Sequence, residues 1–434
     1  MGMSLVTETL GEIVRAGGGE IRTGPYGSLL HRGDYTAGEG VPVVLPRDIV
    51  DGRVSLRAIA RVGEADADRL RKHRLEPGDV VYGRRGDLGR RALVTERETS
   101  WLCGTGCLRI RLGRRSAVDP RFLYYALGHP RLTAQVRSQA VGATLPNLNT
   151  AILKALEITY PPLSAQRRIV AFLGAYDALI DNLERRREIL EELLSGLYRE
   201  WFLRFRFPGH EGFPWVDSDL GPIPSGWTPR RIRDVATIYR GRTYERSSLV
   251  ETGGVPWLNL KCIASGGGFR TSGLRRYVGP YSTTQQARAG DIVMAVTDMS
   301  QDRQVVARAA RVPDLGGEIA AMSIDLIRIE PLPGMDVEYL YGVLRYSRCP
   351  EELAMQANGA NVLHLAPDLI ADYGFLLPPT RLVEQYSEVA GVVTRQRELL
   401  RCKVDNLRKT RDLLLPRLLS GDLDVTHLES QPPA

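Results

Sequence analysis

Two stretches of the chain space apolar residues alternately three and four positions apart, which is the pattern of a coiled-coil seam. Arg186 is the one polar interruption of the first seam, and Arg397 and Arg411 interrupt the second. The pattern predicts two helices of roughly 35 to 40 residues, and because each seam needs a partner, we expect them to pack on each other within one molecule. The seam residues are Ile169, Phe172, Tyr176, Leu179, Leu183, Leu190, Leu193 and Leu197 in the first stretch and Val393, Leu400, Val404, Leu407, Leu414 and Leu418 in the second.

Each predicted helix follows a Pro-Pro pair, in "ITYPPLSAQRRI" (158–169) and "FLLPPTRLVEQY" (375–386). Proline fixes φ and pushes the preceding residue out of the α region, so each pair ends an extended segment and opens a helix. One such corner would be ordinary, but two in matching positions indicate a repeat. Pro416 falls inside the second seam, where we expect a kink or a loose last turn.

The repeat extends over most of the chain. Segments 40–49, 76–87, 119–127 and 139–153 match segments 254–263, 288–299, 336–344 and 356–370 in the same order. For example, "EPGDVVYGRRGD" corresponds to "RAGDIVMAVTDM". A constant order of this kind predicts a tandem duplication of a unit of about 200 residues.

The part of each unit that precedes the Pro-Pro pair contains short runs such as "VPVVL" and "LRIRL" between Gly, Pro and Asp turns, with a helical pattern near 120–139. This composition predicts a globular α+β head. The expected fold class is therefore α+β, with two tandem-repeat heads joined by two long helices in an intramolecular coiled coil. The expected parts are a first head (1–158), a first spacer helix (159–203), a second head (204–376), a second spacer helix (377–424) and a flexible tail (425–434).

Composition and charge narrow the class of protein. The chain has 434 residues, of which 43% are hydrophobic and 25% charged, as in a globular protein of two or three domains. Its 58 basic and 51 acidic residues leave a net charge of +7, mostly from arginine, which suggests a polyanionic partner. Heavy use of Arg in place of Lys, as in GC-rich genomes, would leave the same excess.

Cysteine and histidine usage argues against bound metals. The five cysteines form no C-x-x-C pair and the six histidines are scattered, so we expect no zinc site, no disulfide framework and no cofactor. The N-terminal residues do not resemble a signal peptide, and no apolar run approaches the length of a membrane span. We therefore expect a cytoplasmic protein.

Two heads on a rigid spacer suit an extended ligand such as duplex DNA. The candidate contacts lie in Gly-rich, Arg-rich and Asn-containing loops, whose donors suit phosphates and base edges. The alternative is an Arg-rich surface turn with asparagines that cap the backbone. The predicted DNA contacts are Thr23, Tyr26, Ser28, Arg84, Arg85, Arg90, Arg91, Thr144, Asn147 and Asn149 in the first head and Arg240, Arg242, Thr243, Lys261, Thr297, Arg303, Asn358, Asn361 and His364 in the second.

The catalytic motifs expected of a DNA-modifying enzyme are missing. The "YPPL" and "LPPT" corners lack the amide and the aromatic residue with which a methyltransferase loop holds its target amine. "GTGCLR" lacks the last glycine of the dinucleotide fingerprint, and no P-loop sequence occurs. No catalytic set emerges, which favours a targeting protein that is not itself an enzyme.

Several of these stretches together resemble the DNA specificity (S) subunit of Type I restriction-modification enzymes. The resemblance lies in "GPIPSGWTPRRIRDVATIYRG" (221–241), in "TGPYGSLL" with "GVPVVLPRDI", and in "PPLSAQRRIVAFL" followed by "DNLERRREILEELLSGL". It implies two target-recognition domains that each read one half of a split, asymmetric DNA site, joined by antiparallel helices that set the gap. It also implies two methyltransferase (M) subunits docked on the helices and restriction/translocase (R) subunits outside them.

The chain departs from the family pattern in two places. The second unit has "NVLHL" where the first has "TLPNL", so Asn361 and His364 stand where Thr144 and Asn147 stand in the first unit. The first unit also lacks the "IPxGW" lead-in. Two other classes of function remain open, namely a coiled-coil scaffold whose heads bind protein and an enzyme with an unrecognised motif. A scaffold would enrich no DNA sequence from random duplexes.

Overall fold

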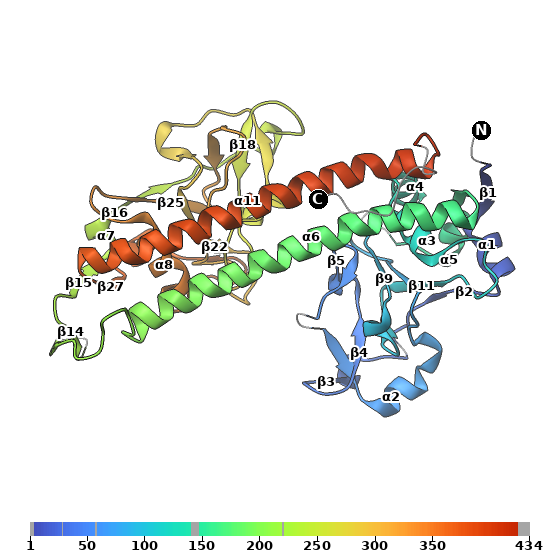
Figure 1. The fold of residues 1–434 in the computed structure, drawn as a ribbon, viewed down its shortest axis with the longest axis horizontal. Helices are drawn as coiled ribbons and strands as arrows, with labels where there is room; N and C mark the ends of the chain where they lie inside the picture. Colours follow the sequence, from blue (N-terminus) through green and yellow to red (C-terminus); the bar gives the residue numbers. More distant parts are fainter. Residues whose placement is uncertain (1–3, 28, 57–58, 140–146, 219–220, 424–434) are drawn as a thin grey trace. The chain divides into compact units, whose positions relative to one another are not determined.

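The computed structural model describes residues 4–27, 29–56, 59–139, 147–218 and 221–423. The chain forms two compact units, one of residues 1–182 with 404–434 and one of residues 183–403. Each unit contains one predicted head and half of each long helix. Figure 1 shows the helices and strands of both units.

The first head contains two four-stranded sheets. In one sheet all neighbours are antiparallel, whereas the other includes a parallel pair, β10–β4. The first sheet has the order β2 (Glu20–Thr23), β11 (Cys107–Arg111), β8 (Val80–Gly83), β9 (Arg91–Leu93). The second has the order β10 (Leu102–Cys103), β4 (Val41–Val44), β7 (Ala60–Val62), β3 (Tyr35–Thr36).

The second head repeats both sheets strand for strand. Its parallel pair, β18–β24, occupies the place of β4–β10, and one further edge strand, β20 (Gln286–Ala287), is added. The first sheet has the order β16 (Ala236–Arg240), β25 (Leu326–Pro331), β21 (Ile292–Ala295), β23 (Ala309–Arg311). The second continues from β20 through β24 (Ala320–Met322), β18 (Val255–Leu258), β19 (Arg275–Tyr277) and β17 (Leu249–Val250). The predicted tandem duplication and α+β class are thereby confirmed.

The short helices follow the same repeat. An aspartate from the matched sequences caps the corresponding helix in each head: Asp119 accepts the amides of Arg121 and Phe122, and Asp336 accepts that of Tyr339. The matching helices are α1 (Leu10–Gly17) and α7 (Ile232–Val235), α3 (Pro120–Ala126) and α8 (Val337–Tyr346), α4 (Pro130–Gln139) and α9 (Cys349–Gln356), and α5 (Thr150–Lys154) and α10 (Pro367–Ala371). The first head also has α2 (Glu64–Arg69).

The remaining strands form pairs, all antiparallel. One pair in each head includes the strand that leads into the Pro-Pro corner. These two pairs are β1 (Val6–Thr9) with β12 (Glu157–Tyr160) and β15 (Thr228–Arg231) with β27 (Gly374–Leu377). The others are β5 (Ile49–Val50) with β6 (Arg53–Val54), β13 (Trp215–Val216) with β14 (Ile223–Pro224), and β22 (Thr297–Asp298) with β26 (Leu363–His364).

The two long helices begin directly after the Pro-Pro corners, as predicted. Helix α6 (Leu163–Tyr198) has 36 residues and runs into a π-helical turn at Arg199–Leu203, while α11 (Thr380–Leu419) has 40 residues. Pro416 lies in the last turn of α11, where the missing N–H interrupts little of the helix. Among the described residues no helix combines the length and the apolar character needed to cross a membrane.

The seams are covered separately in each unit. In the first unit Ile169 and Leu173 of α6 share an apolar cluster with Leu415 and Leu418 of α11. In the second unit the cluster includes Leu194 and Tyr198 of α6 with Tyr386, Ala390 and Val393 of α11. The two helices therefore run antiparallel in each unit. Of the predicted seam residues, Ile169, Tyr176, Leu183, Val393, Leu400, Val404 and Leu418 are buried and Phe172, Leu179, Leu190, Leu197, Leu407 and Leu414 are half-buried.

One seam position differs from the prediction. Leu193 is 51% exposed, whereas Leu194 is only 2% exposed and takes the buried position. From Leu190 the buried side of α6 continues in steps of four, to Leu194 and then Tyr198, because a straight helix has 3.6 rather than 3.5 residues per turn. Leu193 therefore lies on the outer side of α6.

A glycine at the same place in each head should test the duplicated framework. A Cβ on Gly24 would collide with the carbonyl oxygen of Gly104, and a Cβ on Gly241 with that of Ser323. We expect Gly24→Ala and Gly241→Ala each to lower the free energy of unfolding by about 1–3 kcal/mol, measured by urea denaturation. Gly27→Ala is the control, since nothing lies within 4 Å of a Cβ there. Equal midpoints for all three variants would contradict the close packing.

Candidate nucleic-acid interface

The same backbone junction occurs in both heads, where the strand after the "GD" turn meets the segment that leads into the last short helix. In the first head the amide of Leu148 donates to the carbonyl of Arg84 over 3.0 Å, and Arg85 bridges to Asn147. In the second head the amide of Leu365 donates to the carbonyl of Val296 over 2.8 Å. We call residues 84–85 with 147–148 the first junction and residues 296–297 with 364–365 the second junction.

The side chains at the two junctions differ although the backbone is the same. Thr297 pairs with His364 in the second junction, as Arg85 pairs with Asn147 in the first. His364 therefore occupies the structural position of Asn147. The two heads therefore present different side chains on one backbone scaffold.

The first junction brings several predicted contact residues together. The Arg84 guanidinium donates through Nε to the Leu148 carbonyl over 2.9 Å and lies 5.9 Å from the Tyr26 ring centroid. A hydrogen bond with Thr23, together with the nearby Arg84 charge, lowers the pKa of the Tyr26 phenol. Arg85 is exposed beside this group. Thr23, Tyr26, Arg84 and Arg85 thus present a hydroxyl, an exposed aromatic ring and two cations near one junction, a set suited to phosphate and base contacts.

The junction asparagine has an unusual environment. Asn147 is half-buried, and its Oδ1 atom is buried with no hydrogen-bond partner among the described residues. An Asn reads adenine with both amide atoms. Asn147 could do so only after its amide group rotates outward.

Three predicted contacts of the first head have structural partners. Arg91 donates to the Tyr124 carbonyl over 2.7 Å and its guanidinium lies 5.0 Å from that ring centroid. Arg90 forms a 3.2 Å ion pair with Asp87. Asn149 caps α5 by accepting the Ile152 amide over 2.9 Å. These contacts agree with the turn-and-cap alternative, and Ser28 and Thr144 lie outside the described residues.

The second junction has a different chemistry. The Thr297 side chain is 5% exposed and donates to Asp325 over 3.0 Å, so it faces inward. His364 and Asn358 exchange two backbone hydrogen bonds of 2.8 and 3.0 Å, and both side chains are exposed, as is that of Asn361. The surface here is polar and mostly uncharged, in contrast to the arginines of the first junction.

The other predicted contacts of the second head lie on nearby loops. Arg303 donates through Nε to the Ala354 carbonyl over 3.1 Å, and the Arg242 guanidinium donates to the carbonyls of Thr243 and Pro280. Arg240, Thr243 and Lys261 are exposed. The two arginines are therefore held by the protein, while the remaining three side chains are accessible.

In the loop that borders the second junction the sequence prediction named Thr297 and Arg303 but missed Met299 and Gln301. Gln301 donates through Nε2 to the carbonyls of Gly359 and Ala360, and Met299 and Met355 are each 72% exposed. Asp298 organises this loop by accepting the amides of Ser300, Val305 and Val306; although burial opposes it, these hydrogen bonds lower the pKa of the carboxyl group. Within the repeat, Met299 corresponds to Asp87 of the Arg-rich loop, and this match was the signal that could have identified the loop.

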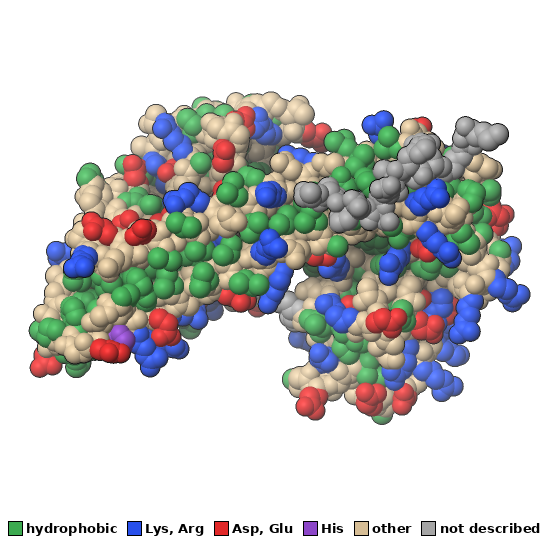
Figure 2. Space-filling view, viewed as in Figure 1, with side chains coloured by type: hydrophobic (Ala, Val, Ile, Leu, Met, Phe, Trp, Pro, Cys, Tyr) green, Lys and Arg blue, Asp and Glu red, His purple; other side chains and the backbone are tan. Residues whose placement is uncertain are grey.

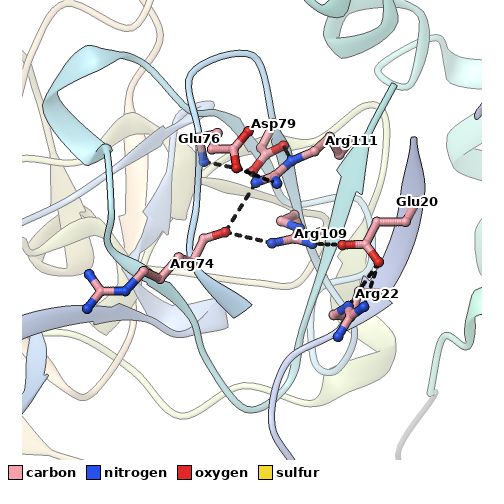
Figure 3. A network of polar contacts seen from close by, with 7 residues as sticks. All are labelled: Glu20, Arg22, Arg74, Glu76, Asp79, Arg109 and Arg111. Carbon is pink, nitrogen blue, oxygen red and sulfur yellow. Dashed lines mark hydrogen bonds and ion pairs between the residues drawn. The ribbon is translucent and has the colours of Figure 1, made fainter. Parts of the chain in front are cut away.

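A second cluster of arginines is internal and does not belong to the interface (Figure 3). Arg109, 2% exposed, donates to the Arg74 carbonyl and pairs with Glu20, while Arg111 pairs with Asp79 over 2.7 Å and with Glu76 over 2.6 Å. Burial lowers the pKa of Arg109. Arg328 has the same register in the second head, where it pairs with Glu330 over 3.0 Å and lies over the Tyr239 ring at 4.5 Å. These arginines brace the central strands and are neutralised by carboxylates.

The described residues contain no group of three or more His, Cys, Asp or Glu side chains that could hold a metal ion. Four of the five cysteines are buried and all are free. In Cys103, burial raises the thiol pKa to about 12, so this side chain behaves as a small apolar residue.

Comparison with known proteins finds a matching family model and relatives that align with most of the chain. Residues 30–192 match the family model described as Type I restriction modification DNA specificity domain. The MjaIX specificity subunit of a Type I restriction enzyme from Methanocaldococcus jannaschii is 23% identical over 326 residues, which cover 72% of this chain and 71% of the relative. The MjaVIII specificity subunit from the same organism is 22% identical and covers 73% of each chain.

Residues 30–192 therefore carry a DNA specificity domain of the Type I restriction-modification kind, and the chain as a whole resembles specificity subunits of these systems. DNA sequence recognition is the function that this similarity supports. The S subunit of the Type I system of M. genitalium has a similar fold, with a TM-score of 0.53 at 15% identity over 96% of both chains. The expected family and fold class are thus confirmed.

Substitution of two neighbouring arginines should distinguish a side chain that contacts DNA from one that holds the loop in position. We expect Arg85→Ala to weaken binding to the cognate DNA without changing the thermal midpoint, by about 1–3 kcal/mol if Arg85 contacts a base. Arg84→Ala should weaken binding and also lower the midpoint, because it removes the bond to Leu148 and the contact with Tyr26. Arg15→Ala, at an exposed arginine of α1, is the control. A loss of binding that is equal on all DNA sequences, with a shallower salt dependence, would indicate phosphate contacts.

Proposed function

We propose that this specificity subunit recognises a bipartite, asymmetric DNA target and directs the methyltransferase and restriction/translocase subunits to it. In this role each head reads one half-site, and the chain supplies no active site of its own. The supporting observation is the junction that recurs in both heads with one backbone and different side chains. The ligand is double-stranded DNA, met in the cytoplasm.

The side chains at the two junctions favour different base contacts. Arg85 and Arg84 of the first junction suit the paired acceptors O6 and N7 of guanine. His364 of the second junction, with Asn358 and Gln301 beside it, suits mixed donor and acceptor edges. The exposed methionines Met299 and Met355 suit apolar contacts such as the thymine methyl group. Two unlike half-sites follow from this difference, so the target is not a palindrome.

The predicted DNA contacts that remain accessible supply the electrostatic part of binding. Among them, Arg85 is exposed in a loop, Arg240 at the end of β16 and Lys261 in a short 3-10 helix. With the net charge of +7, they favour association with phosphates, and this part of the affinity should fall as salt is raised.

Exchange of the first head tests the modular assignment. When residues 1–155 are replaced by the corresponding head of another family member, we expect one half-site of the methylation target to change and the other to stay the same. The change is measured by methylome sequencing of a host that carries the exchanged subunit together with its partner subunits. A change in both half-sites, or in neither, would rule out the assignment of one half-site to each head.

The long helices offer a surface for the methyltransferase subunits. In the second unit Ile189 and Leu193 of α6 and Val389, Val392 and Leu399 of α11 are each between 43% and 58% exposed. Their spacing of three, four or seven residues places those of each helix on one side. Figure 2 shows hydrophobic side chains gathered on the face of the second unit where these helices lie. An exposed apolar stripe of this kind is typical of a protein interface.

Charges placed in this stripe should prevent assembly. We expect Ile189→Glu with Val392→Glu to abolish co-purification with the methyltransferase subunit while the thermal midpoint of the free chain stays within a few degrees, because both residues are already exposed. The control is Val216→Glu, which introduces the same charge at a residue that is 44% exposed on β13. Normal assembly of the double variant would place the docking surface elsewhere.

A further inference from the structure

The arginines that interrupt the second seam have acidic partners on the first helix. In the first unit Arg411 pairs with Asp177 over 2.7 Å, and in the second unit Arg397 pairs with Glu191 over 2.6 Å. All four side chains are between 22% and 28% exposed, so the charges are largely removed from water. A charge in such a place favours the helix alignment in which it meets its partner.

Each of these carboxylates also binds a tyrosine of the adjoining head. Tyr125 of α3 donates to Asp177 over 2.6 Å, and Tyr346 of α8 donates to Glu191 over 3.1 Å. Arg345 of the second head adds a 2.9 Å contact to Glu191. Each ion pair therefore joins three elements, α6, α11 and a helix of one head, within a single unit.

The two ion pairs specify the same alignment of the helices. Asp177 and Glu191 lie fourteen residues, two heptads, apart on α6, and Arg397 and Arg411 lie the same number apart on α11. In antiparallel helices, a step toward the C-terminus of α6 is matched by an equal step toward the N-terminus of α11. The step from Asp177 to Glu191 is therefore matched by the step from Arg411 to Arg397, and one register satisfies both pairs. We propose that Asp177–Arg411 and Glu191–Arg397 form a two-point lock that selects this register and, through it, the length of the DNA spacer between the half-sites. The spacer part of this proposal rests on the proposed function.

Other registers that keep the apolar seams together break the lock. If α11 slides by one heptad in one direction, Arg411 reaches Glu184 but Arg397 faces Tyr198. In the opposite direction Arg397 reaches Glu184 but Arg411 faces Val170. A slide of two heptads restores a carboxylate to one arginine and leaves the other opposite Leu163 or beyond the end of α6 at Phe205. The apolar pattern alone repeats every heptad and cannot exclude these alignments.

Variants that keep a single arginine should shift the register in a chosen direction. With Asp177, Glu191 and Arg397 changed to Leu, Arg411 is the remaining arginine of the second seam, and its nearest seam carboxylate is Glu184, one heptad away. With Asp177, Glu191 and Arg411 changed to Leu, Arg397 reaches the same Glu184 by the opposite shift. A one-heptad shift moves one helix past the other by about 10 Å at 1.5 Å per residue.

The shift can be measured without DNA, by electron spin resonance between nitroxide labels on Gly196→Cys and Lys403→Cys. Both positions are exposed, nothing lies within 4 Å of a Cβ on Gly196, and in the native register they are about 16 Å apart along the helix axis. Cys402 is changed to Ser throughout, and the other four cysteines are buried. We expect the labels to approach by about 10 Å along the axis in the Arg411-only variant and to separate by about 10 Å in the Arg397-only variant.

Single-lock variants are the matched controls. Glu191→Leu with Arg397→Leu, and separately Asp177→Leu with Arg411→Leu, each leave one complete pair and should keep the native label distance. Unchanged distances in both single-arginine variants would overturn the lock and assign the register to apolar packing against the heads.

A second test serves if the triple variants do not fold. It reverses charges at one ion pair instead of replacing them with leucine. Asp177→Arg alone places two arginines together and should lower the thermal midpoint, and the exchanged pair Asp177→Arg with Arg411→Asp should restore it and keep the native label distance. Failure of the exchanged pair to restore the midpoint would contradict a role for this pairing.

DNA selection with the assembled methyltransferase then tests the spacer separately. The two single-arginine variants should select targets whose spacers differ from the native one by about three base pairs in opposite senses, or less if the helices are inclined to the DNA, at about 3.4 Å per base pair. Shifted labels with an unchanged spacer would overturn the link between register and spacer. If the native complex selects no bipartite target, the proposed function fails, whereas the label distances still decide the lock.

Discussion

The apolar sides of the two long helices must be removed from water, and the rest of the structure depends on how this is done. A helix with an apolar stripe gains most of its stability in a protein from packing that stripe against a partner. In the first unit the stripe residues Ile169 and Leu173 share a core with Phe122 and Leu123 of the head and with Leu418 of α11. In the second unit Tyr198 lies 6.1 Å from Tyr339 and 6.0 Å from Tyr386, measured between ring centroids. Head and helices therefore form one core in each unit.

This shared core explains the small differences between the repeats. Gly342 of α8 takes the place of Tyr125 of α3, and a Cβ there would collide with the Tyr198 ring of α6. In the first head the tyrosine itself reaches α6 and binds Asp177. At these equivalent positions a head side chain contacts α6 in the first unit, whereas a side chain of α6 packs against the head glycine in the second. The duplicated framework was adjusted where its two copies meet the helices.

The same framework leaves the junctions free to differ. The strand order of the sheets, the capping aspartates and the close approach at Gly24 and Gly241 are shared by both heads because each satisfies backbone hydrogen bonds or packing that the fold cannot lose. The side chains at the junctions take no part in these shared contacts, so the exposed Arg85 and the inward-facing Thr297, or Asn147 and His364, can occupy equivalent positions. A rigid scaffold with variable loops is the usual arrangement for a protein that recognises many targets by changes of a few residues.

The sequence by itself determined the features that depend only on the order and spacing of residues along the chain. The helices, their Pro-Pro starts, the duplication and the α+β class follow from periodicity, from proline stereochemistry and from repeated order, none of which requires knowledge of distant neighbours. It misplaced Leu193 because a spacing of three and a spacing of four are both compatible with a seam, and only the packed helix buries Leu194 instead.

Only the tertiary structure decided which polar residues face outward. Arg85 and Arg91 look alike in the sequence, yet Arg85 is exposed and Arg91 is held by Tyr124, because the turn between them reverses the chain against α3. Asn149 caps a helix whose start was not evident from the pattern. Arg397 and Arg411 could be recognised as interruptions of a seam, but their partners on α6 depend on the antiparallel register. Contacts between residues distant in the sequence exist only once the chain is folded, and for that reason the seam charges and the junctions could be located but not paired from sequence alone.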